Sequence, residues 1–156
     1  WEAEADRAAE VGIRVVKLRI GIVLAPDGGA LAQMLPPFRL GAGGPIGSGK
    51  QWFPWVHLDD VVAAIEWALT TPSVRGSYNL VGPQPVRQRD FARALGAAVG
   101  RPAVLPAPAF ALRLALGEFA DEGLLSGQRC MPDRLRAEGF GFQHPTLAGA
   151  LAAAVG

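Results

Sequence analysis

The sequence predicts an α/β fold, and three observations carry this prediction. Residues 2–11 are rich in Ala, Glu and Arg, which favour a helix, and Gly12 stands where helices commonly end. The run IRVVKLRIGIVL (13–24) is rich in β-branched residues, as in a buried strand. Helical and extended patterns then alternate along the chain, which is the order of elements typical of α/β proteins.

The segments after residue 24 are predicted from turn residues and local composition. APDGG (25–29) has the composition of a turn, and ALAQML (30–35) that of a short helix. Pro36 and Pro37 prevent that helix from continuing regularly, because proline lacks the backbone N–H and clashes with the preceding turn. QWFPWVH (51–57) favours an extended conformation through its aromatic and β-branched residues.

A long amphipathic helix is predicted for LDDVVAAIEWALTTP (58–72). Asp59 and Asp60 fall in its first turn, where acidic side chains stabilise the start of a helix. Its apolar residues recur at helical spacing, at Leu58, Val61, Val62, Ile65 and Leu69. The remaining predicted elements are a strand at 76–82, a helix at 89–100, a helix at 109–116, a polar stretch at 117–130 and two helices around 132–139 and 145–155.

Composition limits the classes of function. With 156 residues, half of them apolar, the chain fits one compact domain or part of one. Its 15 basic and 14 acidic side chains nearly cancel, so we expect no nucleic-acid partner and no anionic membrane surface as partner. Cys130 is the only cysteine, which excludes an internal disulfide framework and fits a cytoplasmic location. Because Trp1 opens directly into a helical pattern, we expect the chain to be a fragment of a longer protein.

The glycine-rich stretch GAGGPIGSGK (41–50) resembles a phosphate-binding loop only superficially. Gly44, Gly49 and Lys50 have the required spacing, but Gln51 stands where such loops carry the Ser or Thr that binds magnesium. The flanking segments are also not the strand and helix that the motif needs. Two interpretations stay open, a flexible loop and a loop over a substrate cleft, where small residues let a ligand approach the backbone.

Four separated blocks carry a family resemblance. They are RVVKLRIGIVLAPDGGALAQMLPPFRLGAGGPIGSG (14–49), WVHLDDVVAAIEWAL (55–69), GSYNLVGPQPV (76–86) and GQRCMPDRLRAEGFGF (127–142). Together they resemble the carboxy-terminal half of the extended short-chain dehydrogenase/reductase superfamily. More narrowly, the chain is similar to its epimerase family proteins, which are NAD-dependent or sugar-nucleotide epimerase-like and end in a small domain of unknown function.

This resemblance implies the carboxy-terminal part of a Rossmann-like doubly wound parallel sheet, with a small and mainly helical subdomain on the substrate side. Residues 1–25 would be the last helix and strand of the dinucleotide-binding core. Residues 26–82 would form a substrate-lid loop and a strand-helix-strand unit, and residues 83–156 the substrate-side subdomain.

The catalytic machinery of the family is not expected in this chain. Extended members carry a Tyr-x-x-x-Lys pair on a helix that resembles residues 1–12, so the pair would lie before Trp1. The sole tyrosine, Tyr78, has Gly82 four positions later and cannot stand in for it. The G-x-G-x-x-G fingerprint is also absent from the sequence. The implied cofactor, NADP or NAD, would be bound mainly by a missing upstream half.

The resemblance does imply binding roles for residues of this chain. Backbone contact with the nicotinamide is implied for Ile20, Gly21, Ile22 and Val23. A substrate-side role is implied for Leu24, Gly28, Gly29, Met34, Phe38, Lys50, Gln51, Trp52, His57 and Arg129. For residues 20–24 the alternative is a plain core strand, and for Met34 and Phe38 it is ordinary packing.

Two of these residues, His57 and Arg129, and the neighbouring Phe53 have specific interpretations. WVHLDDV resembles the His-Val-Asp-Asp-Val pattern of extended members, although His57 taken alone fits a structural histidine, because the sequence reveals no partner for it. Nucleotide-sugar epimerases often carry a diphosphate-binding arginine four residues before that histidine. Phe53 occupies this position here, which argues against a UDP-sugar and, with Trp52, favours a more apolar or planar ligand. Arg129 is a candidate for an anionic group, with a surface or salt-bridged arginine as the alternative.

We therefore expect the substrate-binding half of an NAD(P)-dependent epimerase- or dehydratase-like oxidoreductase acting on a small molecule. The main alternative is a non-catalytic dinucleotide- or ligand-binding protein with the same fold. A free-standing helical interaction module is a further alternative, and a homodimer is left open.

Overall fold

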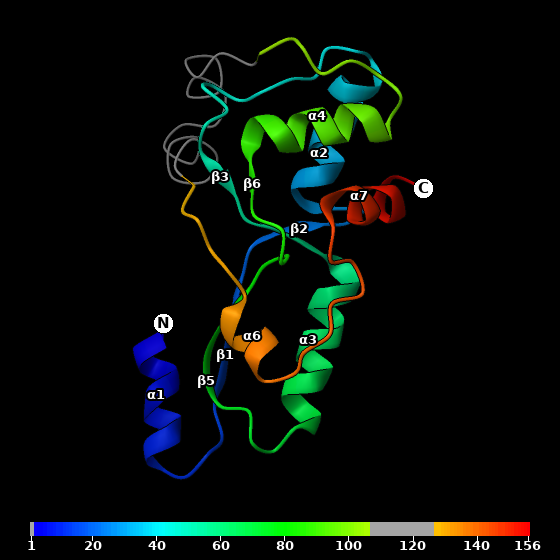
Figure 1. Cartoon of the computed structure of the whole chain (residues 1–156). Helices are drawn as coiled ribbons and strands as arrows, with labels where there is room; N and C mark the ends of the chain where they lie inside the picture. Colours follow the sequence, from blue (N-terminus) through cyan, green and yellow to red (C-terminus); the bar gives the residue numbers. More distant parts are fainter. Residues whose placement is uncertain (1, 107–126) are drawn as a thin grey trace.

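Two parallel strand pairs form the centre of the fold (Figure 1). The computed structural model describes residues 2–106 and 127–156. Its strands are β1 (Val16–Ile20), β2 (Ile22–Leu24), β3 (Trp52–Phe53), β4 (Trp55–His57), β5 (Gly76–Leu80) and β6 (Val86–Arg87). β1 pairs in parallel with β5, β2 in parallel with β4, and β3 in antiparallel orientation with β6. Parallel strands alternating with helices agree with the predicted α/β class.

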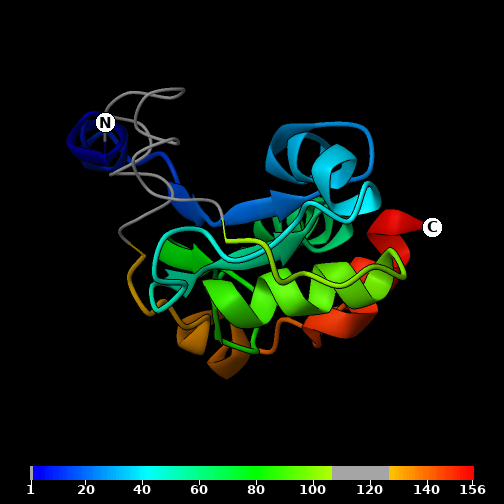
Figure 2. The ribbon, with the colours of Figure 1, turned by 90° about the horizontal axis from the view of Figure 1, so that it is seen from above.

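The described helices lie close to their predicted positions. They are α1 (Glu2–Glu10), α2 (Gly29–Arg39), α3 (Leu58–Thr70), α4 (Gln88–Ala98), α6 (Asp133–Ala137) and α7 (Leu147–Val155). α4 and α7 pack side by side, as Figure 1 and Figure 2 both show. The helix predicted at 109–116 and most of the polar stretch at 117–130 lie outside the described residues.

The predicted single strand over 13–24 is wrong, because the chain changes partner strand at Gly21. The Gly21 N–H donates to the Leu80 carbonyl at 3.0 Å, and the next N–H, of Ile22, donates to the Pro54 carbonyl at 2.6 Å. A side chain at Gly21 would meet the Pro54 carbonyl oxygen and would lie 3.0 Å from Val81 Cγ1. A glycine is therefore required where β1 ends and β2 begins.

α2 continues through Pro36 and Pro37, so the predicted early end of this helix is also wrong. Leu31, Leu35 and Phe38 are all buried on the face that α2 turns toward the core. Burial of these large apolar side chains offsets the two backbone hydrogen bonds that the prolines cannot donate.

α3 begins and ends near its predicted limits but buries a different face. Val61, Ala64 and Ala68 are buried, and the small alanine side chains let the helix lie close to the strands. The other apolar residues of the predicted stripe are exposed, at 41% for Leu58, 58% for Val62, 44% for Ile65 and 71% for Leu69. Periodicity thus located the helix without identifying its buried side.

The core formed by residues 2–106 and 127–156 consists of two clusters. One is built around Trp55 and Phe91 among α2, α4 and α7, and the other around Tyr78 and Phe140. Trp67 packs edge-on against Tyr78, with ring centroids 5.6 Å apart, and against Phe140 at 5.7 Å. The ring of Trp67 therefore serves helix packing.

Tyr78 also joins β5 to the short helix α6. Its hydroxyl donates to Glu138 at 2.6 Å and accepts the Arg75 N–H at 3.3 Å. Arg134 bonds to Glu138 at 2.8 Å and lies 4.1 Å from the centre of the Tyr78 ring. Burial, followed by the bond to Glu138, raises the pKa of Tyr78, and the bond from Tyr78 lowers the pKa of Glu138.

We expect Tyr78→Phe to lower the free energy of unfolding by about 1 to 2 kcal/mol, because the hydroxyl's bond to the Glu138 carboxylate and its longer bond from the Arg75 N–H are lost while the ring is kept. Urea denaturation followed by circular dichroism measures this change. Glu138→Gln, which keeps an acceptor for the hydroxyl, should cost less than Tyr78→Phe. Equal midpoints for Tyr78→Phe and the parent would contradict the expectation.

Candidate functional site

A cavity of about 620 Å³ opens at the carboxyl ends of β1 and β5. Ile20 and Leu80 are the last residues of these paired parallel strands. The residues that line the cavity are Arg19, Ile20, Gly21, Pro54, Asn79, Val81, Gln128, Arg129, Cys130, Met131 and Asp133. In open parallel sheets, ligands bind in the crevice outside the carboxyl ends of the strands. This cavity is therefore the candidate functional site.

Two segments far apart in the sequence form opposite parts of this site. Ile20 and Gly21 come from the end of β1, and residues 128–131 come from the segment before α6. Asn79 Nδ2 donates to the Met131 carbonyl at 3.4 Å, which ties the second segment to β5. Three residues predicted from the resemblance, Ile20, Gly21 and Arg129, are thus brought together.

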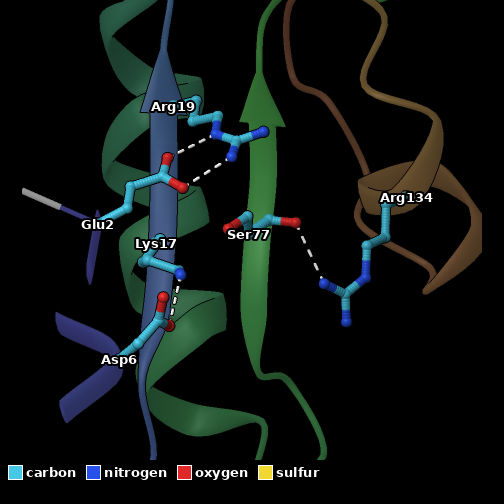
Figure 3. A network of polar contacts seen from close by, with 6 residues as sticks. All are labelled: Glu2, Asp6, Lys17, Arg19, Ser77 and Arg134. Carbon is cyan, nitrogen blue, oxygen red and sulfur yellow. Dashed lines mark hydrogen bonds and ion pairs between the residues drawn. The ribbon is translucent and has the colours of Figure 1, made fainter. Parts of the chain in front are cut away.

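The two arginines at the cavity differ in whether their charge is already paired with a carboxylate. Arg19 donates to both carboxylate oxygens of Glu2, at 2.6 and 2.7 Å, so its charge is already neutralised (Figure 3). The same bond from Arg19 lowers the pKa of Glu2. Arg129 forms no ion pair with any residue in 2–106 or 127–156, and it is exposed. Arg129 is therefore the cation best placed to meet an anionic group at this cavity.

The Trp52 ring contacts the guanidinium of Arg129. The Arg129 guanidinium lies 5.3 Å from the centre of a Trp52 ring, and the Arg87 guanidinium lies 3.6 Å from it. Contacts of this kind hold a guanidinium over an aromatic face while its N–H groups stay available. Trp52 thus acts on the site through its arginine neighbours.

Three other predicted substrate residues, Gly29, Met34 and Phe38, line a second, apolar cavity of about 370 Å³. It is bounded by α2, α4 and the glycine-rich loop, and its lining includes Gly29, Met34, Phe38, Gly43, Gly44, Ile46, Gln88, Phe91 and Leu105. Buried Gln88 holds the loop in place, since its Oε1 accepts the Ile46 N–H at 2.8 Å. The glycine-rich loop follows a helix and forms a cavity wall, an arrangement unlike that of a phosphate-binding loop.

Four further predicted residues lie at neither cavity. Leu24 is fully buried in the core, Ile22 and Val23 are half-buried in β2, and Gly28 precedes α2 with open space around its Cα.

Lys50 and Gln51 have structural contacts in the glycine-rich loop. The exposed Lys50 accepts a bond from Arg87 through its carbonyl, at 2.7 Å. Gln51 Nε2 donates to the Ile46 carbonyl at 3.1 Å. Cys130 is half-buried and lines the candidate site.

His57 is buried at the junction of β4 and α3, at 5% exposure. Its Nδ1 accepts the Asp59 N–H at 3.1 Å and so caps α3, while its Nε2 has no hydrogen-bond partner among the described residues. Its ring centroid lies 3.9 Å from that of His144. Burial lowers the pKa of His57, and the neighbouring His144 lowers it further, against the opposing effect of Asp59 and Asp60.

Asp60 has a role that the sequence did not reveal. It lies in the first turn of α3, as predicted, but His57 makes the helix cap and Asp60 is fully buried. Its two oxygens accept the backbone N–H groups of Gln143 at 2.6 Å and His144 at 3.2 Å. Asp60 therefore fixes the carboxy-terminal segment to α3, a contact across 83 and 84 residues that no local pattern indicates.

Known protein families match both halves of this architecture. A profile of the NAD dependent epimerase/dehydratase family matches residues 1–81, just over half of the chain. The chain belongs to this family. A domain of unknown function, DUF1731, matches residues 107–154 and confirms the resemblance of the tail.

Individual relatives agree with this assignment. The chain is 47% identical to a chloroplastic epimerase family protein, the SDR39U1 homolog of Arabidopsis thaliana, over 98% of this chain and 44% of that protein. The crystal structure of human epimerase family protein SDR39U1 with NADPH superposes with a TM-score of 0.88 at 42% identity, covering 91% of this chain and 48% of that one. The chain spans about half the length of the relatives it matches.

A more distant structure confirms the Rossmann-like fold alone. The UDP-glucose 4-epimerase of Thermus thermophilus, in complex with NAD, has a TM-score of 0.73 at 22% identity, covering 99% of this chain and 49% of that one. Within the described part of the chain, none of the helices has the length and apolar character needed to cross a membrane. Because one relative is chloroplastic, the cytoplasmic location stays a prediction.

Proposed function

We propose that this chain forms the substrate-side half of an NADP(H)-dependent epimerase- or dehydratase-like oxidoreductase. The observation that carries the proposal is the cavity at the carboxyl ends of β1 and β5, where Ile20 and Gly21 face the segment 128–131. NADP(H) is favoured over NAD because the human relative, 42% identical, was solved with NADPH. When bound, the cofactor would supply or accept the hydride.

The residues of this chain would bind and orient the reactants. The backbone at Ile20 and Gly21 would pass along one side of the cofactor, since both residues line the cavity at the carboxyl ends of β1 and β5. Arg129 would hold an anionic group of the substrate, because it lacks an ion-pair partner among the described residues and its guanidinium is supported by Trp52. The substrate proposed here is thus a small carbonyl or hydroxyl compound with a carboxylate or phosphate group.

The alternative function is a ligand-binding protein of the same fold without catalysis. The residues that line the cavity at the carboxyl ends of β1 and β5 would serve either function, because binding alone needs no proton transfer. Binding and turnover separate the two proposals, since only the oxidoreductase consumes NADPH.

We expect the full-length protein to bind NADPH and to oxidise it with carbonyl compounds that carry an acidic group. Arg129→Ala should lower kcat/KM for those compounds by about 10- to 100-fold, the value of one hydrogen-bonded charge pair, and leave NADPH affinity unchanged. Fluorescence titration measures NADPH affinity, and loss of NADPH absorbance measures turnover on matched acidic and neutral carbonyl compounds.

Arg136→Ala provides the matched control, because Arg136 is an exposed arginine of the adjacent helix and lines neither cavity. NADPH binding without oxidation by any compound in the panel would establish the binding-protein alternative. A full-length protein that fails to bind NADPH would overturn both proposals, and equal kcat/KM for Arg129→Ala and the parent would remove Arg129 from the site.

A further inference from the structure

We propose that His57, Asp59 and His144 form a binding site for one divalent transition-metal cation of the Zn²⁺ class. The two segments involved are the β4–α3 junction and the loop before α7, and their residues differ from those at both cavities. One ligand atom from each of the three residues lies within 4.8 Å of the others. The sequence contains only two histidines, and both are here.

The distances between the ligand atoms suit a small tetrahedral ion. Asp59 Oδ2 lies 3.1 Å from His144 Nε2 and 3.4 Å from His57 Nδ1. Zinc binds imidazole nitrogen and carboxylate oxygen at about 2.0 to 2.2 Å, which places neighbouring tetrahedral ligands about 3.3 Å apart. Both separations are close to this value.

The charge of the cluster is also favourable. Asp59 and Asp60 bring two carboxylates, and neither pairs with a Lys or Arg within the described ranges. A cation would therefore balance negative charge that only imidazoles and backbone N–H groups meet at present.

The surrounding structure holds the ligands in place and leaves one side open. His57 is fixed between β4 and α3, and the backbone of His144 is held by buried Asp60. Side-chain exposures of 56% for Asp59 and 20% for His144 provide an entry path for the ion from solvent. Two nitrogens and one oxygen favour Zn²⁺ or Co²⁺ over Mg²⁺ and Ca²⁺, which prefer oxygen ligands.

Metal binding has a defined local cost and a defined consequence. The ion must displace the Asp59 N–H that His57 Nδ1 now accepts at 3.1 Å. In return it would link the start of α3 to the segment that precedes α7. The bound ion should therefore raise the thermal stability of the protein as its concentration rises above Kd.

The test is titration of the chelator-treated protein with Zn²⁺ by calorimetry, with Co²⁺ as an absorbance probe. We expect one ion per chain, a tetrahedral Co²⁺ spectrum, a higher Tm with Zn²⁺, and no binding of Mg²⁺. His144→Ala and Asp59→Asn should each weaken Zn²⁺ binding at least tenfold. Both residues are partly exposed, so the variants should fold, which the Tm without metal verifies.

Asp90→Asn is the matched control, because Asp90 also lies in the first turn of a helix and its side chain is 45% exposed. This variant should bind Zn²⁺ like the parent. The proposal is overturned if no Zn²⁺ binds, if Co²⁺ gives an octahedral spectrum, or if His144→Ala and Asp59→Asn bind Zn²⁺ as tightly as Asp90→Asn.

Discussion

Asp60→Ala is expected to lower the free energy of unfolding by about 3 to 5 kcal/mol, since two hydrogen bonds to a buried charged group are lost together. The Asp60 carboxylate is fully buried and accepts the N–H groups of Gln143 at 2.6 Å and His144 at 3.2 Å. Urea denaturation in chelator-containing buffer measures the loss independently of any bound metal.

Two further variants identify the cause of this loss. Asp60→Asn keeps the size of the side chain but offers only one acceptor oxygen, so its amide would face a backbone N–H, and we expect a loss nearly as large as for Ala. Asp90→Ala removes an exposed first-turn aspartate and should change the free energy of unfolding by less than about 1 kcal/mol. If Asp60→Ala also changed the free energy of unfolding by less than about 1 kcal/mol, the carboxy-terminal segment would be held by its apolar contacts and not by Asp60.

The helices and the extended segments could be predicted because their signals are local. α3, α4 and α7 all lie within a few residues of the predicted ranges, since hydrophobic periodicity and terminal glycines act over single turns. The predicted bounds are wrong where contacts between residues far apart in the sequence determine where an element ends. The break at Gly21 depends on Pro54 and Leu80, and the length of α2 depends on the core into which Phe38 packs.

The candidate site was accessible to prediction only through the family resemblance. Composition and spacing do not indicate that Ile20 and Arg129 lie at one cavity, because they are more than 100 residues apart. The sequence also does not indicate that His57 contacts His144, because the two residues are far apart along the chain. The resemblance also placed Met34 and Phe38 in one substrate site with Arg129, whereas Met34 and Phe38 line the apolar cavity and Arg129 lines the other.

Gly21→Ala should lower the free energy of unfolding by about 3 kcal/mol and abolish NADPH binding by the full-length protein. The new methyl group would meet the Pro54 carbonyl oxygen, a backbone atom that cannot move away without losing its bond from the Ile22 N–H at 2.6 Å. Because Gly21 and Pro54 both line the cavity at the carboxyl ends of β1 and β5, the same displacement would deform the proposed cofactor site.

Gly141→Ala separates this steric effect from the general effect of replacing glycine. No atom lies within 4 Å of a Cβ at Gly141, and its φ is outside the left-handed region, so stability and NADPH affinity should stay near those of the parent. Denaturation and NADPH fluorescence titration on the two variants give the comparison. Loss of NADPH binding in Gly21→Ala with unchanged stability would mean that the methyl group blocks the ligand directly. Unchanged stability and unchanged affinity would mean that the chain does not approach Pro54 this closely, and the strand change at Gly21 would then be wrong.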